Sequence, residues 1–414
     1  MKRMILMIIL FIGIIINISA EDGVVKRDRA TVRSGPGSIF EIISEMTKGD
    51  SFLIVDEQKG WLNIEYNELN GFTSSKVVIE KQGSDDIFSK MGVQETDLKV
   101  SKHGMSAGVK GFADKYTDKF EGSSNFLEDY YALELNADKF KYFKQVTYHE
   151  YDLDKIKDYE LPEYDGKEFY SFNEEGIGFG IAARIAEIGL LKNEELCEYI
   201  NFLGHILVEA SDAYDIGFKF FILDTELVNA YACPGGIVFI TRGMLEILVD
   251  EAELAGVLAH EIAHIARHHG MQEIEERKHH VSSDDAFAEM DAELEEINEG
   301  YDEDIKAIES ELEDIALESY EAIFNGRLAD YEEEADYLAM IYSLRAGYDY
   351  SRLFDLLRRM YAFETESTNE HYSSEQIKDR ITALEKNIKQ IKISHKIDLM
   401  NKQYRWENMK EKLN

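Results

Sequence analysis

Residues 252–270 read AELAGVLAHEIAHIARHHG, and this stretch decides the fold that we expect. Its many Ala and Leu residues, without a proline, predict a helix. In a helix, His260 and His264 lie four residues apart on one face, where both imidazoles can bind one metal ion. Glu261 lies beside them and can take a proton from a water that the metal activates. The plain alternative is a helix with two histidines on its polar face, so the metal hypothesis needs a third ligand.

A second helical pattern offers candidates for that ligand. Residues 330–348, DYEEEADYLAMIYSLRAGY, place Glu332 and Asp336 on one helix face. A carboxylate at Glu332 would complete a site of two histidines and one glutamate, with a fourth position open for water, as in catalytic zinc sites. Asp336 could then accept the free N–H of a ligating histidine. Position alone does not select Glu332 from its neighbours, and we expect Glu333 and Glu334 to be solvated.

The two histidines that follow the first motif are weaker choices for the third ligand. Each four-residue step along a helix rises about 6 Å, so three successive turns do not converge on one small ion. We therefore expect His268 and His269 to lie around the site or at the surface. The metzincin pattern is excluded because it needs Gly and His where this chain has Arg267 and Gly270.

Several motifs in the same order carry a family resemblance. They are VNAYACPGGIVFITRGMLEILVDEAELAGVLAHEIAHIARHHG at 228–270 and EEEAD at 332–336. Here the chain resembles metallopeptidase family forty-eight, the gluzincin endopeptidases of HtpX, CAAX prenyl protease and BepA type. The resemblance implies an α+β fold, with a mainly helical zincin-type metallopeptidase domain and a small edge sheet. It also implies one zinc ion per chain and a set of site residues: the ligands His260, His264 and Glu332, the catalytic base Glu261, and the supporting acid Asp336.

The chain departs from the family pattern in two places. Leu328 and Ala329 stand where the family carries Ser-Arg, with Arg327 one residue away. The family's later T-H-P…R signal is present without its proline, as His371 and Arg380. An electrophilic partner for the developing oxyanion should exist, and we expect His371 and Arg380 as its candidates.

A short strand is predicted just before the first metal motif. Pro234-Gly235-Gly236 is a turn signal, and a β-branched and aromatic run follows it. In gluzincins, an edge strand beside the metal helix pairs with an extended substrate by strand addition. An ordinary structural strand is the alternative, and both can hold. The predicted substrate strand consists of Gly236, Ile237, Val238 and Phe239.

The N-terminal part of the chain predicts export and a small separate domain. Residues 1–20, MKRMILMIILFIGIIINISA, have the form of a signal peptide, or of an anchor whose residues 4–18 associate with a membrane if uncleaved. Residues 22–80 resemble a bacterial SH3-like domain through V-R-S-G-P-G, K-G-D, G-W-L and G-F-T-S-S, and their short alternating runs predict a small β-barrel. Binding of cell-wall peptide and the role of a folded spacer are equally good interpretations.

The remaining segments give a domain order. We expect a connector at 81–165, the zinc metallopeptidase domain at 166–385, and a basic amphipathic C-terminal helix at 386–414, which could dock on its own domain or on a partner. Inside the peptidase domain lies an acidic insertion, 271–326. Residues 271–336 hold 25 Asp and Glu against 4 Lys and Arg. A seven-residue apolar repeat there predicts a coiled-coil or hairpin arm, either solvated or acting as a lid over the site. The repeat consists of Phe287, Leu294, Tyr301, Ile308 and Ile315.

These patterns together predict a zinc-dependent endopeptidase that acts on unfolded or misassembled proteins of the periplasm or cell envelope. The alternative is an envelope chaperone or cell-wall-binding protein with a gated or latent protease site. Hydrolysis of cell-wall murein is a weaker third hypothesis. A net charge of −37 argues against nucleic acid as a partner, because phosphate binding needs a basic surface. The two cysteines are too few for a disulfide scaffold, and Cys233 is expected to be a buried thiol.

Overall fold

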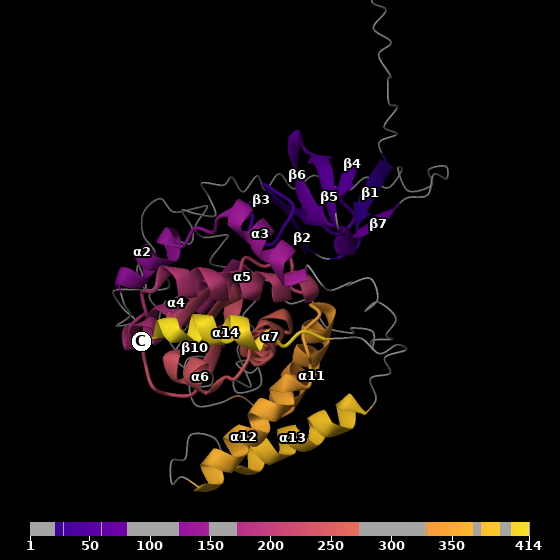
Figure 1. Cartoon of the computed structure of the whole chain (residues 1–414). Coiled ribbons are helices and arrows are strands. Elements are labelled where there is room, and N and C mark those ends of the chain that lie inside the picture. Colours follow the sequence, from indigo (N-terminus) through magenta and orange to yellow (C-terminus); the bar gives the residue numbers. More distant parts are fainter. Residues whose placement is uncertain are drawn as a thin grey trace, which may run out of the picture. The chain divides into compact units, whose positions relative to one another are not determined.

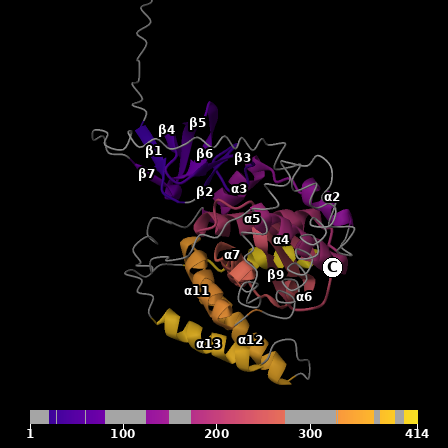
Figure 2. The same cartoon turned by 180° about the vertical axis from the view of Figure 1, so that it is seen from behind.

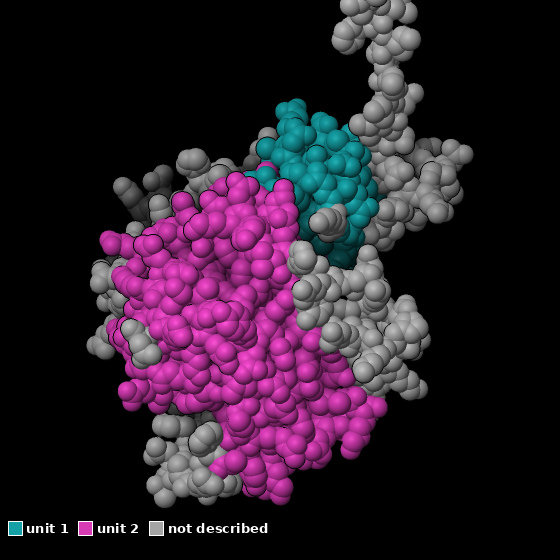
Figure 3. Space-filling model, in the orientation of Figure 1, with its two compact units in different colours: residues 1–36, 45–95 teal, residues 37–44, 96–414 magenta. Residues whose placement is uncertain are grey.

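The structure is a computed structural model that describes residues 21–27, 29–58, 60–80, 124–148, 172–272, 327, 329–366, 374–389 and 399–413. The chain forms two compact units, residues 1–36 with 45–95 and residues 37–44 with 96–414 (Figure 3). The N-terminal segment 1–20, nearly all of the acidic insertion 271–326, and His371 lie outside the described residues. The predictions made for them stay predictions.

The N-terminal strands form one curled antiparallel sheet. At its β5–β6 hairpin, Asn67 and Glu68 both have positive φ, 48° and 64°, as a two-residue type I′ turn requires. Buried Val32, Met46 and Ile64 fill its interior. This agrees with a small SH3-like β-domain. In the order β3-β2-β6-β5-β4-β1-β7, the strands are β1 (Glu21–Val25), β2 (Arg29–Arg33), β3 (Ile42–Thr47), β4 (Ser51–Gln58), β5 (Trp61–Tyr66), β6 (Leu69–Ser74) and β7 (Val78–Glu80).

The second unit is mainly helical around a three-stranded sheet of order β8-β10-β9 (Figures 1 and 2). Its strands are β8 (Lys219–Leu223), β9 (Ala230–Cys233) and β10 (Ile237–Thr241). Its helices are α2 (Ser124–Ala132), α3 (Ala137–Tyr148), α4 (Phe172–Ile185), α5 (Glu194–Ala210), α6 (Arg242–Ile247), α7 (Glu251–Ala266), α11 (Ala329–Arg345), α12 (Arg352–Glu366), α13 (Ser374–Ile388) and α14 (Gln403–Lys410). The expected α+β class, with a mainly helical domain and a small sheet, is confirmed.

Helix α7 is the central helix of this unit, and all its residues from Glu251 to Ile265 are buried. A helix that is apolar on nearly every side can only lie in a core. It packs against α5, α11 and α12. Gly256 permits the approach of α12, because a Cβ atom there would lie 3.0 Å from Cβ of Leu353.

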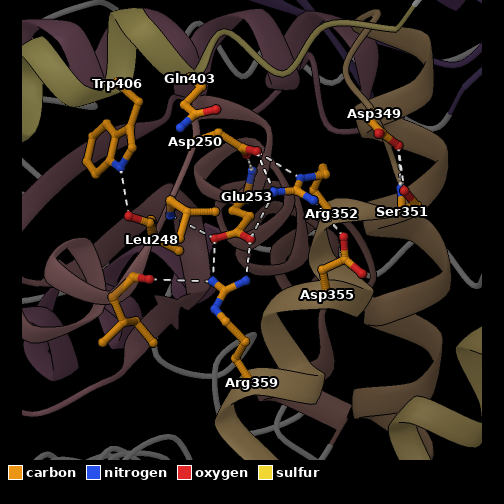
Figure 4. A network of polar contacts seen from close by, with 12 residues as sticks. Leu248, Asp250, Glu253, Asp349, Ser351, Arg352, Asp355, Arg359, Gln403 and Trp406 are labelled. Atoms are coloured by element: carbon orange, nitrogen blue, oxygen red, sulfur yellow. Dashed lines mark hydrogen bonds and ion pairs between the residues drawn. The ribbon is translucent and has the colours of Figure 1, made fainter.

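Carboxylates at its N-terminal end fix the start of α7. Asp250 caps the helix by accepting a hydrogen bond from the Glu253 N–H at 2.9 Å. Two arginines of α12 bind the same carboxylates (Figure 4). Arg352 Nε donates to Asp250 at 2.8 Å, and Arg359 donates to both oxygens of Glu253 at 2.6 Å. Because α7 carries the histidine motif, these pairs set the position of that motif relative to α12.

The segment predicted to be a connector contributes to the core of the second unit. Phe126 of α2 is 1% exposed and packs against the rings of Phe179, Phe221 and Phe239. Phe140 of α3 is also buried. Residues 124–148 therefore contribute two helices to the second unit.

Within 386–414, which we expected to form one basic amphipathic helix, the structure describes the end of α13 and the short helix α14, on which Trp406 is fully buried. Cys197 and Cys233 are both free, and Cys233 is the buried thiol that the sequence predicts. Among the described residues, no helix is long and apolar enough to cross a membrane.

Candidate metal centre

Helices α7 and α11 bring three predicted ligands together. His260 and His264 come from α7 and Glu332 from the first turns of α11. The two Nε2 atoms lie 3.0 Å apart, and each lies 3.4 Å from one carboxylate oxygen of Glu332. The choice of Glu332 among three adjacent glutamates, which rested on the family resemblance, agrees with this arrangement.

The spacing of these atoms fits a zinc ion. Ligands about 2.0–2.1 Å from a tetrahedral centre lie about 3.3 Å from one another. The three donor atoms all lie within 4.8 Å of one another. Two neutral imidazole nitrogens and one carboxylate are also a usual donor set for zinc, so the residues present fit the metal that the sequence predicts.

Asp336 and Arg380 bind the side chains of this cluster. Asp336 lies one turn after Glu332, and its carboxylate is 2.9 Å from Nδ1 of His260. Arg380 of α13 donates to both oxygens of Asp336, at 2.7 and 2.8 Å. Its third guanidinium nitrogen lies 2.8 Å from Glu332. Asp336 thus lies beside His260, where the sequence predicts a supporting acid, and Arg380 binds both Asp336 and Glu332.

Burial and these partners together set the charges of the site. Burial opposes ionisation of Glu332 and Asp336, but Arg380 and the hydrogen-bonded histidines together outweigh it and keep the pKa of both carboxyls below the usual values. Burial also lowers the pKa of His260, whereas hydrogen bonds to Asp336 and Glu332 raise it more strongly, to about 9. Burial raises the pKa of Glu261 to about 7. The cluster therefore concentrates negative charge on Glu332 and Asp336, as a cation site needs.

A pocket opens directly at this cluster. Its polar wall contains His260, Glu261, His264, Glu332, Arg327 and Arg380, and strand β9 runs along it. The lining also includes apolar side chains: Met244 on α6, Val257 on α7, and Leu353, Leu356, Leu357 and Met360 on α12. The pocket thus combines a metal-type donor set and a buried carboxylic acid with an apolar surface.

The strand prediction needs one correction. Residues 237–241 do form a strand, but β10 pairs with β8 on one side and with β9 on the other. Both edges of β10 are therefore occupied, and residues 236–239 cannot offer a free edge to a substrate. Within the described part of the chain, β9 is an edge strand of this sheet, and its residues 230–232, with Asn229 before them, line the pocket.

Two side chains already bind the outer edge of β9. Arg327 donates to the carbonyl oxygen of Ala232 at 2.7 Å. The Asn229 side chain accepts from the N–H of Ala230 at 2.8 Å. Since residues two apart present backbone groups to the same edge, Ala230 and Ala232 mark the edge that faces the pocket.

Several residues of the site are not identified by sequence alone. The spacing Leu353, Leu356, Leu357, Met360 indicates one face of a helix, but nothing in it says that this face lines the pocket. Arg327 stands outside the family pattern and is nevertheless a pocket residue. Of the two candidate transition-state stabilisers, Arg380 lines the pocket, whereas His371 lies outside the described residues.

Comparison with known proteins agrees with this geometry. The model of Peptidase family M48 matches residues 198–388. A beta-barrel assembly-enhancing protease of Yersinia pestis is 34% identical over 93 residues, which are 22% of this chain and 19% of that protein. The protease of the same name from Escherichia coli is 33% identical over 89 residues, 22% of this chain and 18% of the relative.

A third relative is also named as a peptidase. The mitochondrial metalloendopeptidase OMA1 of Schizosaccharomyces pombe is 35% identical over 71 residues, 17% of this chain and 21% of the relative. The chain thus spans about a fifth of the length of the curated relatives it matches. The family match covers all three converging ligands and Glu261, and the chain therefore carries a domain of Peptidase family M48.

Proposed function

We propose that this chain is a zinc-dependent endopeptidase acting on polypeptides of the cell envelope. The observation that carries the proposal is the meeting of His260, His264 and Glu332 at one point, with Glu261 in the same pocket. The names of the relatives, two assembly-enhancing proteases and a metalloendopeptidase, support it. An exported location rests on the form of residues 1–20.

The chain's own residues account for the proton transfers of peptide hydrolysis. A zinc ion held by His260, His264 and Glu332 would activate a water and polarise the scissile carbonyl. Glu261 takes the proton of the attacking water and returns it to the leaving amine. Burial raises the pKa of Glu261 and so makes its carboxylate a stronger base than that of an exposed glutamate.

The walls of the pocket favour an extended peptide with a large apolar side chain near the scissile bond. Strand β9 can pair with the substrate main chain, using the edge marked by Ala230 and Ala232. The apolar wall of α6, α7 and α12 would take the side chain. Such segments are exposed in unfolded or misassembled proteins and buried in folded ones, so we propose the former as the substrates.

Replacement of Glu261 by Gln tests the mechanism. The amide keeps the size of the side chain but cannot take a proton, so cleavage of unfolded casein should fall by about 100-fold or more. Zinc content, measured by mass spectrometry, should equal that of the parent. Glu333→Gln is the matched control, because Glu333 is exposed on the same helix as Glu332.

Two outcomes would change the proposal. Cleavage by Glu261→Gln at the parental rate would remove Glu261 from the mechanism. A parent chain that binds zinc but cleaves only after deletion of residues 283–324 would favour the gated alternative. Proteins trapped by Glu261→Gln in cell extracts of the producing organism would identify the substrates.

A further inference from the structure

The two histidines of the metal centre differ in the group that their Nδ1 atoms contact. His260 directs its Nδ1 to the carboxylate of Asp336, at 2.9 Å. Nδ1 of His264 instead lies 2.9 Å from Nδ1 of another imidazole, that of His269. On the far side of that ring, Nε2 of His269 lies 3.3 Å from a carboxylate oxygen of Glu334. His264 is therefore linked to a carboxylate only through His269.

A turn at the end of α7 brings His269 back to His264. The helix ends at Ala266, and His268 adopts a left-handed φ of 55°. This conformation is uncommon for residues other than Gly, Asn, Asp and His. It redirects the chain so that the His269 ring packs edge-on against the His264 ring, with 5.0 Å between centroids. The turn thus gives His269 a position that a continuing helix would not.

The surroundings of His269 leave its ring little freedom. The residue is fully buried, and Tyr331 stacks on its ring at 4.6 Å between centroids. Its partner Glu334 also binds Nε of Arg267, at 2.8 Å. Helix α11 supplies Tyr331 and Glu334 from the same turn that supplies Glu332, so one helix places both the third ligand and the partners of His269.

We propose that His269 is a positioning residue that fixes the ring orientation and tautomer of His264 for zinc. The inference rests on the zinc site proposed above. Nε2 of His264 faces His260 and Glu332, and a nitrogen that binds a metal carries no proton. The proton of His264 then lies on Nδ1 and is donated to Nδ1 of His269. His269 in turn carries its proton on Nε2 and donates it to Glu334.

His269 does not act as a ligand in this arrangement. The nitrogen that it presents faces Nδ1 of His264, on the opposite side of the imidazole from Nε2. The three donor atoms that meet belong to His260, His264 and Glu332. The spacing argument from sequence disfavoured His269 as a ligand but could not give it a partner, because its contacts depend on the turn and on a helix 62 residues or more away in sequence.

Zinc affinity of full-length variants tests the proposal without using peptidase activity. His269→Phe keeps the ring and its stacking on Tyr331 but removes both nitrogens. Loss of a hydrogen-bonding partner behind a ligand typically weakens metal binding by about 10–100-fold. We expect that increase in zinc Kd, measured by competition with a chelating dye. His269→Asn places an amide oxygen close to the site of Nδ1, and should recover most of the affinity.

Matched controls separate this role from a general effect on folding. His268→Asn makes the same substitution at the adjacent buried histidine, whose Nδ1 binds Glu174 and whose φ suits Asn. It should leave the zinc Kd unchanged. Circular dichroism and the unfolding midpoint of each metal-free variant report whether it folds. If His269→Phe does not fold, Glu334→Gln takes its place, with a smaller, several-fold loss expected.

A folded His269→Phe variant that binds zinc as tightly as the parent would overturn the proposal. So would a folded His269→Asn variant that binds as weakly as the Phe variant. If His269→Phe does not fold, an unchanged zinc affinity in a folded Glu334→Gln variant would also overturn the proposal. Absence of zinc binding by the parent itself would instead reject the zinc site, and with it the proposed function.

Discussion

At the residue scale, Arg380 has its donors directed to carboxylates of the metal centre. It binds both oxygens of Asp336 and one oxygen of Glu332, at 2.7 to 2.8 Å. The sequence predicts a transition-state stabiliser at this position, and that stays a prediction. The contacts favour a different role, in which the guanidinium of Arg380 keeps the neighbouring carboxylates of Asp336 and Glu332 ionised and in place.

Replacement of Arg380 by Met separates these two roles. Without the guanidinium, Glu332 and Asp336 repel each other in a buried site, and the pKa of at least one should rise. We expect zinc binding to weaken by about 10–100-fold, as for other partners of metal ligands. An unchanged zinc Kd with a lowered kcat would instead support the transition-state role. Arg358→Met, at an exposed position of α12, is the control.

The residues of the site also show what sequence can give at this scale. The spacing of His260 and His264 predicts one helix face, because that geometry is local. Selection of Glu332 needed the family pattern, since all three adjacent glutamates fit the spacing. Glu334, expected to be solvated, binds His269 and Arg267. Contacts between residues so far apart in sequence depend on how α7 and α11 pack.

At the element scale, α12 supplies much of the apolar lining of the pocket. Leu353, Leu356, Leu357 and Met360 give it an apolar face toward the metal centre.

Strand β10 shows how far sequence can predict a sheet. Its β-branched run predicts a strand correctly, but its central place depends on parallel pairing with β8 and antiparallel pairing with β9. Strand order arises from such long-range pairings, and periodicity does not encode it.

A charge placed on this face of α12 should change the cleavage pattern. Met360 is half-buried at the pocket, so Met360→Glu brings a carboxylate to the apolar wall without filling the core. We expect kcat/KM to fall by about tenfold or more for peptides with a large apolar residue at the cleavage site, and Lys or Arg to gain there. Sequencing of products from a peptide library measures both.

Met409→Glu is the matched control for this change, because Met409 is half-buried on α14 and outside the pocket. It should leave the cleavage pattern as in the parent. An unaltered pattern in Met360→Glu would show that α12 does not contact the substrate side chain next to the scissile bond. The position at which preference changes, before or after the cleaved bond, would give the direction in which the peptide runs along β9.

At the scale of the whole molecule, the C-terminal segment holds the helix that carries the metal site. Arg405 of α14 binds both carboxylate oxygens of Glu251, the first residue of α7. Arg405 also donates to Thr147 of α3 at 2.9 Å, and Trp406 donates to the carbonyl of Leu248 at 3.1 Å. The sequence predicts a basic amphipathic helix in this segment that docks on its own domain or on a partner. The particular acid, a fully buried Glu251, follows only from tertiary packing.

Removal of Arg405 should therefore destabilise the helical unit strongly. In Arg405→Met, Glu251 remains buried without its cation, which costs about 3–5 kcal/mol in comparable ion pairs. The double variant Arg405→Met with Glu251→Gln removes the charge as well and should recover much of that loss. Urea unfolding followed by fluorescence measures both. The chain has two tryptophans, so a Trp61→Phe background leaves Trp406 as the reporter of this unit. Equal destabilisation in the single and double variants would mean that the buried charge of Glu251 is not what Arg405 compensates.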